Sequence, residues 1–116
     1  MASHGVCLAQ TRPTFQHIVI DPNPVNGDGS PSYEKALVDI DGDGKLDAVL
    51  GAGQINGGAG GLYWYKAPSS GRLSDPWIKH TIASYGHFYE SMAVFDVNGD
   101  GAPDIIASVE NKLVVD

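Results

Sequence analysis

The sequence predicts an all-β fold built from short strands and many turns. The chain of 116 residues contains 15 glycines and 7 prolines, and it shows no long amphipathic helix pattern. Short apolar runs, many of them β-branched, alternate with segments rich in Gly, Pro and Asp, which is typical of strands and turns. A hydrophobic share of 42% is enough for one modest core. We therefore expect a small domain of antiparallel strands.

An acidic nine-residue motif occurs twice and organises the chain. The first copy, Asp39-Ile-Asp-Gly-Asp-Gly-Lys-Leu-Asp47, recurs as Asp96-Val-Asn-Gly-Asp-Gly-Ala-Pro-Asp104. Both copies have an oxygen-bearing side chain at positions 1, 3, 5 and 9, and a glycine at position 6, where the chain must bend sharply. Two copies of so specific a pattern argue against a chance match.

Several hard oxygen ligands in one tight turn are the chemistry that calcium prefers. We predict one Ca²⁺ per loop and two per chain. The predicted ligands combine acidic or amide side chains with one backbone carbonyl per loop: Asp39, Asp41, Asp43, Lys45 (carbonyl) and Asp47, then Asp96, Asn98, Asp100, Ala102 (carbonyl) and Asp104. Asn98 lowers the charge of the second loop and Pro103 stiffens it, so we expect the second site to be the weaker one.

The residues around each loop argue against an EF-hand or dockerin. An EF-hand requires a bidentate Glu at position 12 and helices on both sides, but position 12 is Leu50 in one copy and Ala107 in the other. Short apolar runs flank both loops instead. Each loop is therefore expected to join two antiparallel strands, and its last Asp is expected to open the second strand.

This loop-in-hairpin pattern resembles the FG-GAP (VCBS-type) repeat of β-propellers, including the head of integrin α-subunits. The resemblance covers nearly all of the chain after residue 14, although the Phe-Gly and Gly-Ala-Pro signatures of the family are not intact. It implies four-stranded propeller blades, two per chain, each with a structural calcium ion.

We label the four strands of a blade a, b, c and d, with the calcium loop between a and b. Aligning the two copies then gives eight expected strands in the order d, a-b-c-d, a-b-c over residues 15–116, after a flexible N-terminal segment 1–14. The expected strands are 15–20, 36–38, 47–51, 62–66, 77–83, 93–95, 104–109 and 112–116. Propellers need roughly four to eight blades, so two blades cannot close a ring. We expect a homotrimer or homotetramer to close it. A piece of a longer propeller is the open alternative.

Net charge and composition limit the classes of partner that the chain can bind. A net charge of −7 argues against nucleic acid or an anionic membrane as partner. No apolar run near the N-terminus is long enough for a membrane span, so we expect no membrane insertion. The single cysteine, Cys7, excludes an intrachain disulfide. Weak calcium sites fill at the millimolar calcium found outside cells, which favours a secreted or cell-surface protein.

Carbohydrate is the ligand that we expect, with adhesion to a protein as a variant. Residues 64–68 have the pattern Trp-Tyr-x-x-Pro, and residues 77–82 have the pattern Trp-x-x-His-x-Ile. Both are similar to segments of secreted bacterial and fungal propellers, some of them appended to carbohydrate-active enzymes. Aromatic faces and polar groups together suit a sugar, and the candidate residues are Trp64, Trp77, Tyr85, His87, Tyr89 and Glu90. Packing between blades is the competing role for the tryptophans. Two alternatives stay open: a purely structural self-assembling repeat, and the propeller part of a lyase-like or dehydratase-like enzyme.

Overall fold

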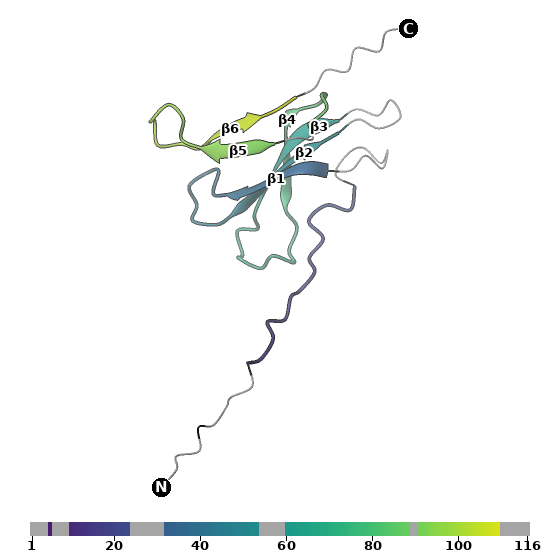
Figure 1. The fold of residues 1–116 in the computed structure, drawn as a ribbon, viewed down its shortest axis with the longest axis vertical. Coiled ribbons are helices and arrows are strands. Elements are labelled where there is room, and N and C mark those ends of the chain that lie inside the picture. The colour runs from purple at the N-terminus through teal and green to yellow at the C-terminus, as the bar shows by residue number, and fades with distance from the viewer. Residues whose placement is uncertain (1–4, 6–9, 24–31, 54–59, 89–90, 110–116) are drawn as a thin grey trace.

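The computed structural model describes residues 5, 10–23, 32–53, 60–88 and 91–109. These residues contain strands and no helix, as the sequence predicted. The strands are β1 (Ser32–Val38), β2 (Asp47–Ala52), β3 (Gly61–Lys66), β4 (Ile78–Ala83), β5 (Met92–Phe95) and β6 (Asp104–Ala107). β1 to β4 form a four-stranded antiparallel sheet in sequence order, as expected of one blade, and β5 pairs with β6 in a second sheet (Figure 1).

Each acidic loop joins the two strands of a hairpin. The β1–β2 pairing closes at Val38 opposite Asp47, and the β5–β6 pairing closes at Phe95 opposite Asp104. The prediction that the last Asp of each loop opens a strand is therefore confirmed. In Figure 1 both loops project from the same side of the molecule.

One face of the first sheet packs against the second sheet. Residues paired across neighbouring strands share a face, and Ala36, Val49 and Trp64 are paired in this way. Val49, Leu62 and Phe88 form the buried centre of this layer. The second sheet contributes the partly buried side chains of Met92, Ile105 and Ala107. The contact between the sheets therefore uses every second residue of each strand.

The opposite face of the first sheet has its own apolar cluster. Its buried members are Ala52, Tyr63 and Tyr65, with Leu50 and Trp77 among the partly buried residues around them. Tyr63 and Tyr65 lie on this face, whereas Trp64 lies on the face toward the second sheet, as the alternation along the strand predicted.

A buried carboxylate fastens the two sheets together. Glu34 of β1 is only 4% exposed, and its Oε1 accepts hydrogen bonds from Ser91 N (2.7 Å) and Ser108 Oγ (3.0 Å). Gly51, the β2 partner of Glu34, has no room for a side chain, because a Cβ there would lie 2.9 Å from Phe88 Cβ. β1 begins at Ser32, earlier than the predicted start at residue 36.

The strand expected at 15–20 is absent from the structure, where residues 10–19 have no regular secondary structure. A strand needs a neighbour to satisfy its backbone groups, and the predicted arrangement gave this one to the second blade. The strand expected at 112–116 lies outside the described residues. In the ranges that the structure covers, no helix is long and apolar enough to cross a membrane.

Candidate metal centre

Three carboxylates of the first loop lie close enough to hold one cation. One oxygen from each of Asp39, Asp41 and Asp43 lies within 4.8 Å of the others. Three anionic oxygens in this arrangement fit a hard divalent cation such as Ca²⁺ in donor type and in charge. The sequence predicted that these same three residues share one metal site.

The backbone of the first loop wraps around Asp39. Its Oδ1 accepts hydrogen bonds from Gly42 N (2.8 Å) and Asp43 N (3.1 Å), and its Oδ2 accepts one from Gly44 N (2.8 Å). Gly42 and Gly44 have φ values of 74° and 84°, which side-chain-bearing residues rarely adopt. The glycines of the motif therefore allow the turn that holds the position-1 carboxylate in place.

Asp47 ties the end of the first loop to the sheet. Its side chain is fully buried, and it accepts hydrogen bonds from Ile40 N (3.2 Å) and Ala67 N (2.7 Å). Ala67 follows directly after β3, so this one carboxylate connects the loop with a third strand. Each of its oxygens keeps a further lone pair, and its role as a calcium ligand stays a prediction, as does that of the Lys45 carbonyl.

Two lysines place positive charge on the first loop. Lys66, the last residue of β3, forms ion pairs with Asp41 and with Asp43, the latter at 3.3 Å. Lys45 pairs with Asp43 at 3.7 Å. Sequence reasoning missed Lys66 as a site residue. Its only signal was a lysine ending a predicted strand, and nothing in the sequence showed that this strand end meets the loop.

The second loop repeats the backbone network of the first. Asp96 accepts hydrogen bonds from Gly99 N (2.6 Å), Asp100 N (3.1 Å) and Gly101 N (2.8 Å). The hydrogen bond from Gly101, assisted by those from the other amides, holds the pKa of Asp96 below its ordinary value of 3.8. Asp104 accepts from Val97 N (3.0 Å). Asp96 is thus kept ionised, as a metal ligand must be.

Asn98 and Asp100 complete the network of the second loop. Asn98 Oδ1 accepts a hydrogen bond from Asp100 N (2.8 Å), and Asp100 Oδ1 accepts one from Ala102 N (2.8 Å). Positions 3 and 5 of the motif therefore turn toward the loop backbone as they do in the first copy. Metal ligation by Asn98, Asp104 and the Ala102 carbonyl stays a prediction.

Those aromatic candidates for ligand binding that the structure describes lie in separate places. Trp64 and Trp77 lie on opposite sides of the first sheet, and Trp77 donates a hydrogen bond from Nε1 to Leu73 O (2.9 Å). Tyr85 is 73% exposed and borders a separate hollow, and His87 is half-buried beside it in the chain. Tyr89 and Glu90 lie outside the described residues.

The Trp64 side chain contacts the neighbouring strand, and its role in ligand binding stays a prediction. Its indole stacks on the His80 imidazole, with ring centroids 4.3 Å apart and an interplanar angle of 19°. Its Nε1 is buried and has no hydrogen-bond partner within the described part of the chain. The stack joins β3 to β4, whose residues Trp64 and His80 are paired.

Comparison with protein families agrees with this geometry. A family described as FG-GAP-like repeat matches residues 39–107, which runs from the first acidic loop through β6. No curated protein and no solved structure matched the chain.

Proposed function

The chain belongs to the family of FG-GAP-like repeats, and we propose that it is a calcium-stabilised β-propeller module that binds carbohydrate. The cluster of Asp39, Asp41 and Asp43 carries the calcium part of this proposal. The same loop network, recurring at Asp96, supports a second ion.

Calcium would act on stability through the connections of the loops. The first loop joins β1 to β2, and Asp47 links it to the residue that follows β3. An ion there offsets the repulsion between carboxylates and favours the closed loop. At tenfold excess over its Kd, each ion adds about 1.4 kcal/mol to the free energy of unfolding. Sites of this kind fill at millimolar calcium, so we place the protein outside the cell or on its surface.

Thermal unfolding tests the calcium part. We expect the midpoint of the EDTA-treated protein to rise by several degrees in millimolar calcium and by much less in equal magnesium. An Asp41→Ala/Asp43→Ala double variant should lose part of the rise. Asp75→Asn should keep all of it, because Asp75 lies outside both loops and bonds to Ser70. Equal midpoints of the unmodified protein in calcium and EDTA would refute the proposal.

The surface around Tyr85 supports carbohydrate as the ligand class. The exposed phenol ring borders a hollow of about 450 Å³ that Ile82, Ser84, Phe88 and Val109 also line. An exposed aromatic ring beside apolar and hydroxyl-bearing side chains suits the alternating faces of a sugar. Repeated shallow sites around a ring would give avidity without tight individual binding.

A glycan screen with the calcium-loaded protein tests the ligand class. We expect at least one glycan to bind, and Tyr85→Ala to weaken that binding by up to about tenfold, in line with the loss of one stacking ring. Ile78→Ala is the matched control, because Ile78 is also exposed but lies on β4 outside the hollow. Absence of glycan binding would leave a purely structural repeat. Sugar turnover lost in His87→Ala would indicate the enzyme alternative instead.

A further inference from the structure

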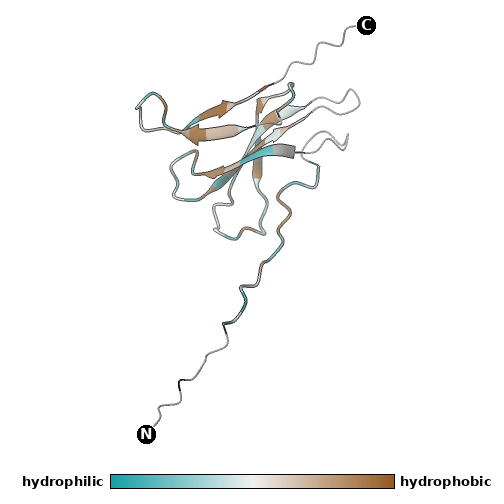
Figure 2. Cartoon of the chain, viewed as in Figure 1, coloured by the Kyte–Doolittle hydropathy of each residue, from teal (hydrophilic) through white to brown (hydrophobic). Residues whose placement is uncertain are grey.

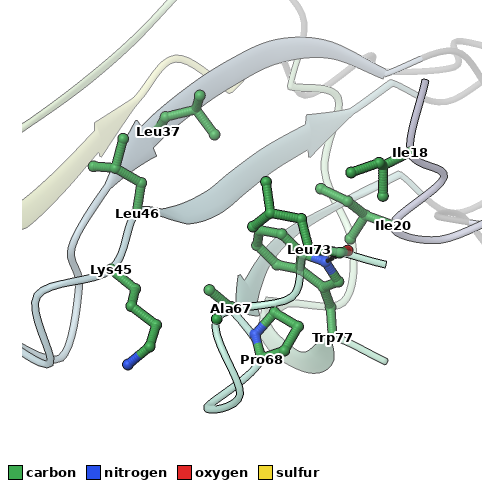
Figure 3. Close-up of a pocket in the computed structure, with 10 residues that line it drawn as sticks. Ile18, Ile20, Leu37, Lys45, Leu46, Ala67, Pro68, Leu73 and Trp77 are labelled. Atoms are coloured by element: carbon green, nitrogen blue, oxygen red, sulfur yellow. Dashed lines mark hydrogen bonds between the residues drawn. The ribbon is translucent and has the colours of Figure 1, made fainter. Parts of the chain in front are cut away.

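The first sheet has an apolar groove on the side away from the second sheet. The groove holds about 470 Å³ and runs between the first loop and the β3–β4 connection (Figure 3). Leu37 and Leu46 form one side, where they are 68% and 59% exposed, and Trp77 lies on the other side. Aliphatic side chains this exposed, gathered around one groove, indicate an interaction surface.

The second sheet has an exposed apolar face on the side away from the first sheet. Phe95, Val97 and Ile106 are between 50% and 53% exposed. Phe95 and Ile106 alternate with the residues of β5 and β6 that pack on the first sheet. Figure 2 shows that both strands of this small sheet are mainly hydrophobic. We call Phe95, Val97 and Ile106 the outer face.

The sequence repeat relates both exposed surfaces to the contact inside the chain. Aligning the loops on Asp39 and Asp96 makes Val94, Ile105 and Ala107 equivalent to groove-side residues of the first sheet. Those equivalents are Leu37, Ala48 and Leu50. The surface that the second sheet uses to pack on the first sheet is thus the counterpart of the groove side.

The reverse equivalence holds for the outer face. The first sheet packs on the second through Val38, Ile40 and Val49, and the same alignment makes these equivalent to Phe95, Val97 and Ile106. The chain therefore repeats both halves of its internal contact and leaves one copy of each half exposed.

We propose that a second copy of this chain covers the groove, with its outer face packed against the first sheet as the two sheets pack within one chain. The inference rests on the proposed propeller function, because it treats each sheet as one blade. The two surfaces differ, so the contact is head-to-tail, and its repetition closes a ring or extends as a chain of molecules. Burial of Phe95, Leu37 and their neighbours stabilises the contact.

The N-terminal segment supports a neighbouring copy at this place. Asp21 accepts hydrogen bonds from Tyr65 Oη (2.8 Å) and Lys79 Nζ (3.1 Å), which hold the segment against the first sheet. Ile18 lines the groove, whereas Phe15 is 91% exposed. The sequence of 15–20 matches that of the edge strand β4, yet these residues pair with no described strand. An edge of the docked sheet would give the segment a partner.

Light scattering of the unmodified chain and three variants in millimolar calcium tests the contact. We expect the unmodified chain to form an assembly, and Leu37→Glu and Phe95→Glu each to fall to the mass of one chain, 12.2 kDa. A buried charge without a partner opposes each contact. Ile78 is also exposed but lies outside both surfaces, so Ile78→Glu should assemble as the unmodified chain does.

Mixing the two monomeric variants separates a head-to-tail contact from any other. Leu37→Glu keeps an intact outer face and Phe95→Glu keeps an intact groove, so the mixture should form a dimer of about twice the mass of one chain and nothing larger. Failure of the mixture to associate would overturn the proposal, as would a monomeric unmodified chain. Calcium titration of the same variants should show undiminished binding. An unmodified chain that binds calcium but stays monomeric would refute the contact alone, whereas absence of calcium binding in the unmodified chain would refute the proposed function.

Discussion

The two acidic loops share one backbone network and differ in their surroundings. In both, the position-1 aspartate accepts hydrogen bonds from three loop amides. In the first loop, Asp47 is fully buried and accepts a hydrogen bond from Ala67 N. The Lys66 ammonium forms an ion pair with the Asp43 carboxylate of the same loop. In the second loop, Asp104 is half-buried and accepts from Val97 N. Nine residues therefore determine the local fold of the loop, while the rest of the sheet determines its charge and anchoring.

This difference bears on which loop binds calcium more tightly. Counting acids alone, the sequence ranks the second loop lower, because Asn98 stands where the first loop has Asp41. The structure adds two ammonium groups to the first loop, those of Lys45 and Lys66. Among the described residues, no ion pair is formed by an aspartate of the second loop. We therefore expect the calcium affinity of the second loop to be close to that of the first, although the second loop has one carboxylate fewer.

The largest expected effect comes from removing the position-1 aspartates one at a time. Asp39→Ala should abolish calcium binding in the first loop, because it removes a ligand and the acceptor for three amides. Asp96→Ala should do the same in the second. In two-dimensional NMR, Asp39→Ala should lose the calcium-induced shifts of the Gly42 and Gly44 amides and keep those of Gly99 and Gly101. Shifts lost in both loops of either variant would show that the loops are not independent.

The position-9 aspartates should differ in their contribution to stability without metal. Asp47→Ala leaves two amides without an acceptor, one of them that of the buried Ala67, and should lower the free energy of unfolding by about 3 kcal/mol. Asp104→Ala frees a single amide and should cost about 1 kcal/mol. Urea unfolding in EDTA measures both. Equal losses would contradict the anchoring that distinguishes the first loop.

Removing the Lys66 charge should strengthen calcium binding in the first loop. A partly exposed ion pair is worth about 1 kcal/mol at most, so we expect Lys66→Met to raise the affinity of this loop about fivefold. Calcium titration in an Asp96→Ala background isolates the first loop. Lys35→Met is the control, since Lys35 lies on β1 away from the acidic loops. A lower affinity in Lys66→Met would mean that Lys66 organises the loop for the ion.

The smallest effect concerns Asp21, which holds the N-terminal segment against the first sheet. Burial raises the pKa of Asp21, but hydrogen bonds from Asn23, Tyr65 and Lys79 outweigh it and leave the pKa below the ordinary value of 3.8. The ionised carboxylate thus contributes stability above that pH, and the contribution is lost as pH falls below it. Asp21→Asn should show a weaker acid dependence of unfolding between pH 5 and pH 2. An unchanged pH dependence of unfolding in Asp21→Asn would show that the ionised Asp21 carboxylate does not stabilise the fold.

The sequence was informative wherever structure depends on neighbouring residues. The acidic loops, the hairpins that contain them and the opposite orientations of Trp64 and Tyr63 follow from short motifs and strand alternation, and all were predicted. The convergence of Asp39, Asp41 and Asp43 was predicted for the same reason, because the three residues lie in one turn.

Contacts between distant residues could not be predicted in this way. Lys66 reaches Asp41 only because the β2–β3 register brings the end of β3 beside the loop. Glu34 reads as an ordinary strand residue, yet it binds Ser91 across the two sheets. The expected strand at 15–20 was matched to β4 by its sequence, but a strand also needs an edge to pair with, and residues 15–20 pair with none of the described strands.

Isothermal titration of the EDTA-stripped chain with calcium tests the central claim most directly, because it counts ions. The account predicts two ions bound per chain, with one remaining in each of Asp39→Ala and Asp96→Ala. Binding of no ion at millimolar calcium, or a stoichiometry unchanged by both substitutions, would contradict the claim that the two acidic loops are calcium sites.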